Sequence, residues 1–88
     1  MADVTLTLLG KPGCHLCDEA KHVVDGVAAE LEAQGRPVRV VERSILDDPE
    51  LERRFHDDIP VVLIGDTVHG RWRFDAERLR AAVLRSAG

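Results

Sequence analysis

Two cysteines three positions apart, Cys14 and Cys17, lie where a strand-like segment gives way to a helical one. Residues 4–9 alternate in the manner of a β-strand, and the sequence Lys-Pro-Gly at 11–13 breaks that run. After Cys14, apolar residues recur at helical spacing as far as Leu31. The sequence therefore predicts a C-x-x-C pair at the start of a helix that directly follows a strand. In this position the pair indicates redox chemistry more strongly than the bare motif, which also occurs in zinc sites.

The rest of the chain continues the alternation of strands and helices. Gly35 and Pro37 end the first helix, and the strand after it would lie parallel to the first strand with a right-handed crossover. Asp48 followed by Pro49 is typical of a helix start, and Asp75 would cap a last helix. The further predicted strands are residues 38–42, Val61–Ile64 and residues 67–70. A two-residue turn that begins with glycine joins the last two strands, so the predicted order is β-α-β-α-β-β-α.

Composition limits the classes of partner. The 88 residues are enough for one core, and we expect a single domain over residues 1–88. The net charge is −4 and no basic stripe is present, so we expect no nucleic-acid partner. Arginines make the last third of the chain locally basic. The acidic residues between them indicate a solvated face, and the alternative is a site for an anion or an acidic partner.

Residues 4–9 are too short and polar for a signal peptide or membrane helix, so we expect a cytoplasmic location, where cysteines stay reduced.

The helical pattern predicts that the two thiols differ in exposure. At about 100° per residue, the apolar stripe of the first helix centres near Leu16, Ala20 and Val27. Cys17 lies about 60° from that centre and Cys14 about 120°. We therefore expect Cys17 to be covered and Cys14 to lie at the exposed rim. In this arrangement the thiol of Cys14 attacks first, and the thiol of Cys17 reacts afterwards.

The predicted position of Cys14 also favours its ionised form. Unpaired N–H groups and the helix dipole at a helix N-terminus stabilise an anion. Lowering the pKa of a thiol from about 8.5 to about 7 requires about 2 kcal/mol, which such a terminus can supply. Lys11 could add to this effect, and a protonated His15 beside the nucleophile could do the same. The alternative for His15 is a plain exposed residue at the start of the helix.

Along nearly its whole length the chain resembles the glutaredoxin family of the thioredoxin-like superfamily. The resemblance is carried by Lys11-x-x-Cys14-x-x-Cys17, by Ile59-Pro60 ahead of a strand, and by the order of elements. It implies a thioredoxin-like α/β fold, with a four-stranded mixed sheet of order 2-1-3-4 flanked by three helices. It also implies a dithiol site in which Cys14 is the nucleophile and Cys17 the resolving cysteine.

The resemblance further implies where a substrate would bind. In glutaredoxins the proline at the position of Pro60 is cis and faces the cysteines, and the residue before it, here Ile59, pairs through its backbone with the substrate's cysteine. Lys11 stands where the family attracts the carboxylate of glutathione. The family's glycine pair is reduced to Gly70, and His-Leu replaces the usual Pro-Tyr between the cysteines, so the thiol partner stays open. The expected substrate-binding residues are Lys11, His15, Ile59, Pro60, Gly70, Arg71 and Trp72.

Two apolar residues have alternative roles. Trp72, the one tryptophan of the chain, could form the floor of a substrate groove near Pro60, or it could cover the edge of the sheet. Leu16 is expected in the core, with a substrate contact as the alternative.

These observations favour a thiol–disulfide oxidoreductase that reduces disulfides of proteins or low-molecular-weight thiols through Cys14 and Cys17. We expect a monomer with no bound cofactor or metal and no membrane partner. Glutathione or another low-molecular-weight thiol is the candidate co-substrate, and a reductase or small thiol would recycle the dithiol. Two other classes stay open. One is a zinc or iron–sulfur module, since two cysteines are half a zinc site; the other is a thioredoxin-fold interaction domain without turnover.

Overall fold

A four-stranded sheet in the order β2-β1-β3-β4 forms the centre of the molecule, of which the computed structural model describes residues 4–87. The strands are β1 (Val4–Gly10), β2 (Val38–Ser44), β3 (Val61–Ile64) and β4 (Thr67–Arg71). β2 runs parallel to β1, whereas β3 is antiparallel to both β1 and β4. The sheet is therefore mixed and has the predicted order; residues 1–3 and 88 of the predicted domain lie outside the described residues.

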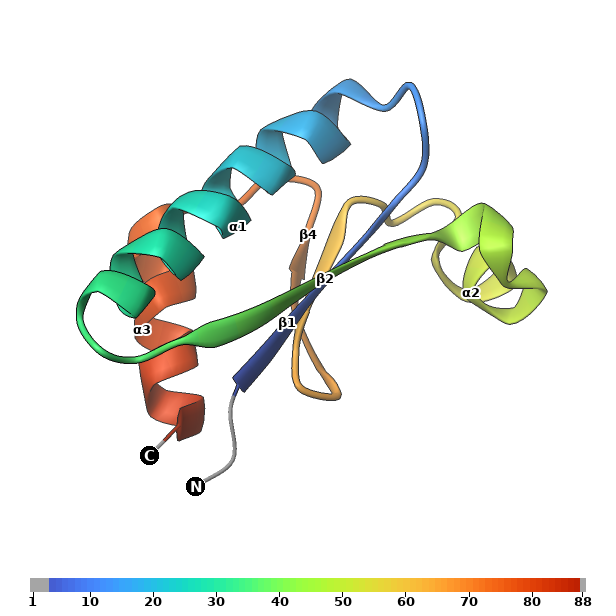
Figure 1. The fold of residues 1–88 in the computed structure, drawn as a ribbon. Helices are drawn as coiled ribbons and strands as arrows, with labels where there is room; N and C mark the ends of the chain where they lie inside the picture. Colours follow the sequence, from blue (N-terminus) through green and yellow to red (C-terminus); the bar gives the residue numbers. More distant parts are fainter. Residues whose placement is uncertain (1–3, 88) are drawn as a thin grey trace.

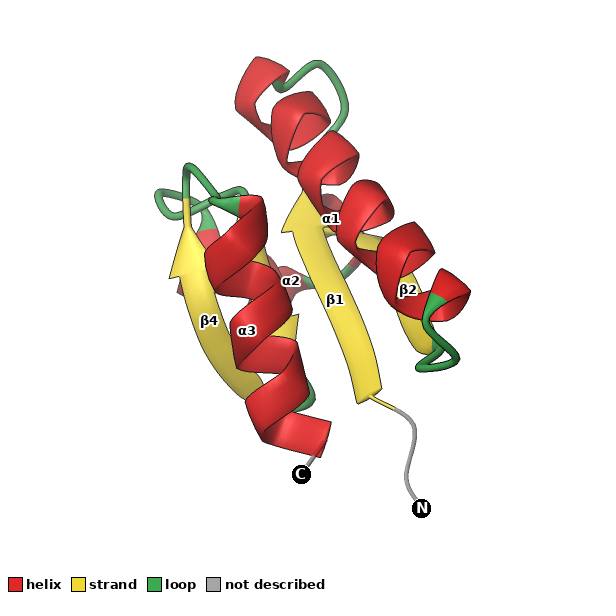
Figure 2. Cartoon of the chain, turned by 90° about the vertical axis from the view of Figure 1, so that its left-hand side faces the viewer, coloured by secondary structure: helices red, strands yellow, loops and turns green. Residues whose placement is uncertain are grey.

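The helices cover the two faces of the sheet unequally (Figure 1). α1 (His15–Ala33) and α3 (Ala76–Ala87) lie side by side on one face, as Figure 2 shows. The short α2 (Pro49–Phe55) and the 3₁₀ turn η1 (Ile45–Asp47) lie toward the opposite face, at the end where β1 finishes. The predicted thioredoxin-like arrangement, with three helices about this sheet, is thus confirmed for the described part of the chain.

Side-chain caps hold the helix starts that the sequence predicts. The carboxylate of Asp48 accepts a hydrogen bond of 2.9 Å from the backbone N–H of Glu50. The carboxylate of Asp75 accepts hydrogen bonds of 2.8 and 3.2 Å from the backbone N–H groups of Glu77 and Arg78. Each cap satisfies donors that have no partner inside the helix, which contributes about 1 kcal/mol.

The sheet separates two apolar clusters. Because successive residues of a strand face opposite sides, Leu8 of β1 enters one cluster and Leu9 enters the other. The larger cluster, between the sheet and α1 and α3, contains Leu6, Leu8, Ala20, Val24, Val27, Leu31, Val62, Ile64, Leu79, Ala82 and Val83. The smaller cluster, on the α2 side, contains Leu9, Ile45, Phe55 and Val61. β1 is therefore fixed from both faces, and with it the position of its last residue, Gly10.

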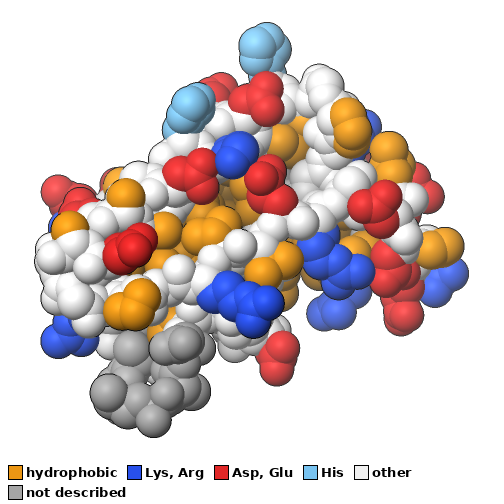
Figure 3. Space-filling view, viewed as in Figure 1, with side chains coloured by type: hydrophobic (Ala, Val, Ile, Leu, Met, Phe, Trp, Pro, Cys, Tyr) orange, Lys and Arg blue, Asp and Glu red, His pale blue; other side chains and the backbone are white. Residues whose placement is uncertain are grey.

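Strand β2 forms one edge of the sheet and crosses the face seen in Figure 3. Its exposed residues Arg39, Glu42 and Arg43 carry both signs of charge, and acidic and basic side chains alternate with apolar ones across this face. Charged side chains on an edge strand discourage pairing with a strand of another molecule.

Several boundaries differ from the prediction. β1 is one residue longer than predicted and β2 is two residues longer, because their parallel pairing continues to Gly10 and Ser44. β4 is one residue longer, because Arg71 pairs with Val61 of β3. The turn Ile45–Asp47 was not predicted. Leu16, expected in the core, is partly exposed, since the first turn of α1 extends past the end of β1. Within residues 4–87, no helix is long and apolar enough to cross a membrane.

Candidate functional site

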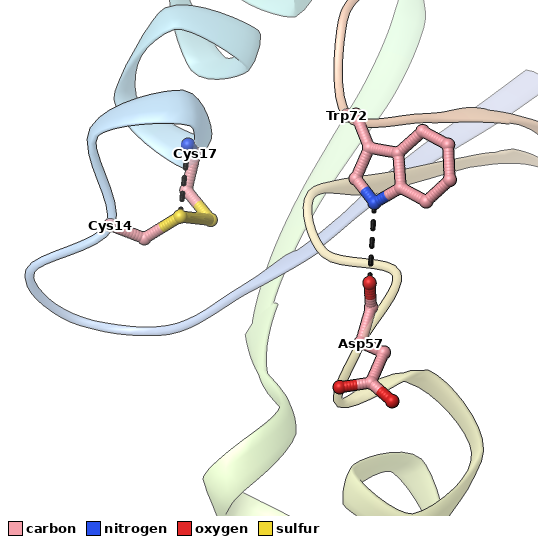
Figure 4. Close-up of a disulfide and its surroundings, with 4 residues drawn as sticks. All are labelled: Cys14, Cys17, Asp57 and Trp72. Atoms are coloured by element: carbon pink, nitrogen blue, oxygen red, sulfur yellow. Dashed lines mark hydrogen bonds between the residues drawn. A yellow bond between two sulfur atoms is a disulfide. The ribbon is translucent and has the colours of Figure 1, made fainter.

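Cys14 and Cys17 meet at the N-terminal end of α1 (Figure 4). Cys14 is the N-cap residue, and the two sulfurs are joined in a disulfide with the Cα atoms 5.1 Å apart. A disulfide requires Cα atoms within about 4.4–6.8 Å, so no backbone movement is needed to make or break this bond. The pair can therefore alternate between dithiol and disulfide at a fixed helix terminus.

The sulfur of Cys14 lies where the helix stabilises negative charge. The backbone N–H of Cys17 donates a hydrogen bond of 3.2 Å to Sγ of Cys14. This N–H is one of those that have no partner within the helix, and the helix dipole adds to its effect. Asp18, in the same first turn, opposes both with its own negative charge. The helix end thus stabilises the thiolate of Cys14, and the negative charge of Asp18 reduces that stabilisation.

The two cysteines differ in exposure as the helical pattern predicts. Cys14 is partly exposed, whereas Cys17 is buried, with 8% of its surface accessible. Gly10 packs directly against Cys17: a Cβ atom built on Gly10 would lie 2.9 Å from the sulfur and 3.2 Å from the Cβ of Cys17. β1 therefore ends in a residue without a side chain because the sulfur of Cys17 occupies that space.

A cavity of about 300 Å³ opens on the β2 side of Cys17. Its wall includes Lys11, Lys21 and Glu42. The ammonium group of Lys21 lies 3.1 Å from the carboxylate of Asp25 and 3.3 Å from that of Glu42. Its hydrogen bonds, first to Asp25 and then to Glu42, raise the pKa of Lys21 above its usual value. Lys21 therefore stays protonated and its charge is compensated by these two carboxylates. Lys11 and Cys17 line the same cavity.

The segment that precedes β3 lies across from the cysteines. Its Ile59–Pro60 peptide bond is cis, and Pro60 is fully buried. Trp72, which follows β4, anchors this segment with two hydrogen bonds. Its backbone N–H donates to the carbonyl of Pro60 at 2.8 Å, and its indole Nε1–H donates to the carbonyl of Asp57 at 3.2 Å (Figure 4). The loop that precedes β3 and the loop that follows β4 are therefore joined by hydrogen bonds, and together they form one wall of the site.

The backbone of Trp72 has an uncommon conformation. Its φ is 71°, in the left-handed region that glycine ordinarily occupies. The backbone N–H of Arg73 donates to the carbonyl of Arg71 at 2.9 Å, which closes a γ-turn about Trp72. Such a conformation costs a bulky residue about 1–3 kcal/mol and persists only where the surroundings enforce it. The hydrogen bonds that Trp72 donates to Pro60 and Asp57 hold it in this conformation.

The structure brings some of the predicted substrate-binding residues together. Pro60 and Trp72 are directly hydrogen-bonded, and Nε of Arg71 lies 3.8 Å from the carboxylate of Asp58 in the same wall. Ile59 belongs there as well, and its side chain packs partly buried against the smaller apolar cluster.

The other predicted residues lie apart from that wall. Lys11 lines the cavity on the β2 side of Cys17, and His15 is exposed as the first residue of α1. Gly70 lies within β4, where an added Cβ would lie 3.4 Å from the ring of Phe74. A side chain at this position would thus meet that ring at ordinary van der Waals distance.

Three residues of the site were not predicted. Gly10 could have been found, since a glycine at the end of an apolar strand often marks a close backbone approach. Asp57 contributes only its carbonyl, and Phe74 is placed by the turn at Trp72, so the sequence carries no signal for either.

Metal ligands do not gather near the cysteines. Across residues 4–87, no group of three or more His, Cys, Asp or Glu side chains is arranged to hold a metal ion. The two cysteines alone amount to half of a tetrahedral zinc site.

Comparisons with known proteins agree with this geometry. A solved structure of a target protein, XcR50, from X. campestris is 35% identical, with a TM-score of 0.67 and coverage of 94% of this chain and 99% of that one. Chloroplastic thioredoxin z is 20% identical, with a TM-score of 0.72 and coverage of 98% and 80%, which shows the shared fold alone.

Relatives of known sequence point the same way. The uncharacterized protein Rv0508 of Mycobacterium tuberculosis is 30% identical over 86 residues, which cover 98% of this chain and 89% of that protein. The family model for the glutaredoxin-like domain (DUF836) matches residues 5–84. That match, a thioredoxin-like fold and a C-x-x-C pair at a helix N-terminus support a redox-type role. The chain belongs to the glutaredoxin-like domain family.

Proposed function

We propose that this protein is a thiol–disulfide oxidoreductase in which Cys14 attacks and Cys17 resolves. The observation that carries the proposal is the arrangement at the start of α1. One partly exposed sulfur accepts a backbone N–H at the helix N-terminus, and a second, buried sulfur lies within bonding reach of it. Thiolates are the attacking species in disulfide exchange, so the exposed and stabilised sulfur is the one suited to attack.

The reaction proceeds in two exchanges. The Cys14 thiolate attacks one sulfur of the substrate disulfide, forms a mixed disulfide, and releases the other sulfur as a thiolate that takes up a proton. Cys17 then loses its proton and attacks the sulfur of Cys14. The Cys14–Cys17 disulfide forms and the second substrate thiol departs, so two electrons have passed from the protein to the substrate.

A donor of two electrons must restore the dithiol. We propose that either two molecules of a low-molecular-weight thiol such as glutathione or a dithiol reductase supplies them, without a tightly bound cofactor. In a reducing cytoplasm this protein would act as a disulfide reductant and thus as a carrier in electron transport.

The substrate would bind against the wall that contains Pro60. In thioredoxin-like proteins the residue before the cis proline, here Ile59, pairs through its backbone with the substrate, and we propose the same contact for this chain. Lys11 and Arg71 offer positive charge on either side for a substrate carboxylate, and His15 borders the attacking sulfur.

Trapping of the mixed disulfide tests the proposal. With Cys17→Ser, the second exchange is blocked, so incubation with a disulfide substrate should leave that substrate covalently attached to Cys14. Cys14→Ser is the matched control, because the remaining thiol is buried and should capture nothing. Capture by Cys14→Ser alone would reverse the two roles, and no capture by either variant, with no turnover by the wild type, would refute the proposal.

A further inference from the structure

A groove lies between α1 and the turn at Trp72, on the other side of α1 from the cavity described above. Its volume is about 210 Å³. It is lined by Ala20 and Val23 of α1, by Trp72 and Phe74, and by the charged residues Glu19 and Arg73. Pockets for whole small molecules typically measure about 300–1,000 Å³, so this groove is suited to a single side chain.

The exposure of Trp72 is not explained by the stability of the fold. Trp72 is 51% exposed, although its backbone is held in a strained turn. Its one polar atom, Nε1, already donates to the carbonyl of Asp57. The surface that remains open is therefore the apolar ring face, which is kept toward solvent at the cost of strain. Strained residues held in this manner are concentrated at binding sites and active sites.

The groove and the cysteine site lie along the same helix. Ala20 lies six residues after Cys14, which corresponds to about 9 Å along the axis of α1. An extended polypeptide advances about 3.3 Å per residue. A substrate whose cysteine is bonded to Cys14 would therefore present a residue about three positions away to this groove.

The charges at the groove do not select a charged occupant. Glu19 and Arg73 carry opposite signs, and both are exposed. The other four lining residues are apolar, and an aromatic side chain such as that of Trp72 binds aliphatic and aromatic groups well.

Resting on the function proposed above, we propose that Trp72 is a specificity-determining residue that selects polypeptide disulfides carrying an aliphatic or aromatic side chain about three positions from the reactive cysteine. The occupant of the groove is that side chain. The preferred substrate class is accordingly a protein or peptide disulfide, since a low-molecular-weight disulfide without such a side chain leaves the groove empty.

Single-turnover exchange with short peptides tests this inference. Each peptide carries one cysteine in mixed disulfide with 2-nitro-5-thiobenzoate, and leucine or alanine occupies the third position on each side of the cysteine. The aromatic thiolate is the better leaving group, so Cys14 attacks the peptide sulfur, and the rate of colour release reports recognition of the peptide. We expect the reduced wild type to react about tenfold faster with the leucine peptide, the order of discrimination that apolar pockets reach.

The variants separate selection from folding. Trp72→Gly removes the indole and suits a positive φ, so the leucine-to-alanine ratio of rates should fall close to one. Trp72→Phe keeps an aromatic face and should retain much of the ratio. Val23→Ala widens the groove from the side of α1 and leaves the turn at Trp72 unchanged. Its ratio of rates should lie between that of the wild type and that of Trp72→Gly. This variant therefore tests the inference even if Trp72→Gly does not fold. Leu46→Ala removes a similarly exposed apolar side chain, 58% accessible, elsewhere, and should keep the ratio of the wild type.

The outcomes distinguish the two proposals. A wild type that reacts with both peptides at equal rates, or a Trp72→Gly variant that keeps the full ratio, overturns the selection by Trp72 and leaves the oxidoreductase intact. A wild type that reacts with no peptide faster than free cysteine does refutes the oxidoreductase itself.

Discussion

Gly10 and Cys17 are in such close contact that a single methyl group cannot be added to Gly10 unless one of the two residues shifts. A Cβ atom on Gly10 would lie 2.9 Å from Sγ of Cys17, closer than such atoms approach in folded proteins. The end of β1 thus sets the position of the buried sulfur, and the first turn of α1 sets the position of the exposed one.

Gly10→Ala should therefore destabilise the protein by about 1–3 kcal/mol, the usual effect of overpacking a closed contact. The measurement is urea unfolding of the reduced protein. The contact also positions the resolving sulfur, so the variant should release substrate from the mixed disulfide more slowly than the wild type.

Gly26→Ala is the matched control for this substitution. Gly26 lies inside α1 with nothing within 4 Å of an added Cβ, so alanine should stabilise the protein by about 0.5–1 kcal/mol through helix propensity. Equal effects of the two substitutions would contradict the contact described here.

Removal of the negative charge of Asp18 should make Cys14 more reactive. In the reduced protein, the helix terminus should hold the pKa of the Cys14 thiol below the value of about 8.5 for free cysteine. Asp18→Asn should then raise the rate of iodoacetamide alkylation of Cys14 at slightly acidic pH up to about fivefold, since a first-turn charge contributes about 0.3–1 kcal/mol. Glu32→Gln, at the far end of α1, should leave the rate unchanged, and a decrease with Asp18→Asn would contradict the proposed electrostatics.

Most of the fold could be predicted because its signals are local. The alternation in β1, the cap at Asp48 and the glycine at Gly65 each act over a few residues, and Gly65 does adopt a positive φ of 60°. The buried position of Cys17 also followed from helical spacing alone. Leu16 was misplaced because spacing does not show where the sheet beneath a helix ends.

The features that sequence patterns did not reveal depend on contacts between distant segments. Trp72 has no intrinsic preference for a positive φ, and hydrogen bonds to Asp57 and Pro60, more than ten residues earlier, hold it there. The register shift between Val62 and Leu63 in the pairing of β3 with β4 likewise depends on tertiary packing. The groove beside α1 therefore became visible only in three dimensions.

Asp75→Ala should cost about 1 kcal/mol of stability, because it removes the acceptor for two backbone N–H groups at the start of α3. Asp75→Asn is the matched variant, since asparagine also caps helices well and should keep most of the stability. Urea midpoints of the two variants provide the comparison. An asparagine variant as unstable as the alanine variant would show that the negative charge, and not the hydrogen bonds, carries the effect.

His69 should make the stability fall in mild acid. Burial first, and then the positive charge of Arg85, hold the pKa of His69 below its ordinary value of 6.5, while its ring stacks against Phe74 with the centroids 6.4 Å apart. The folded state therefore binds this proton less readily than the unfolded state. As the pH falls through 6.5, the unfolded chain takes up the proton first, so the free energy of unfolding decreases until the folded-state pKa is passed.

Urea unfolding at a series of pH values from about 7.5 to about 5 gives the free energy of unfolding as a function of pH. The contribution of His69 is the difference between the pH dependence of the wild type and that of a variant in which His69 is replaced. His69→Gln cannot titrate and should show a shallower loss of stability toward acid than the wild type. Arg85→Leu removes the repelling charge, so the pKa of His69 should rise and the loss should also become shallower, although less so than in His69→Gln. The three exposed histidines are unchanged in both variants and cancel in the comparison. A loss equally steep in His69→Gln and the wild type would mean that the partly buried ring of His69 does not cause the loss of stability in mild acid.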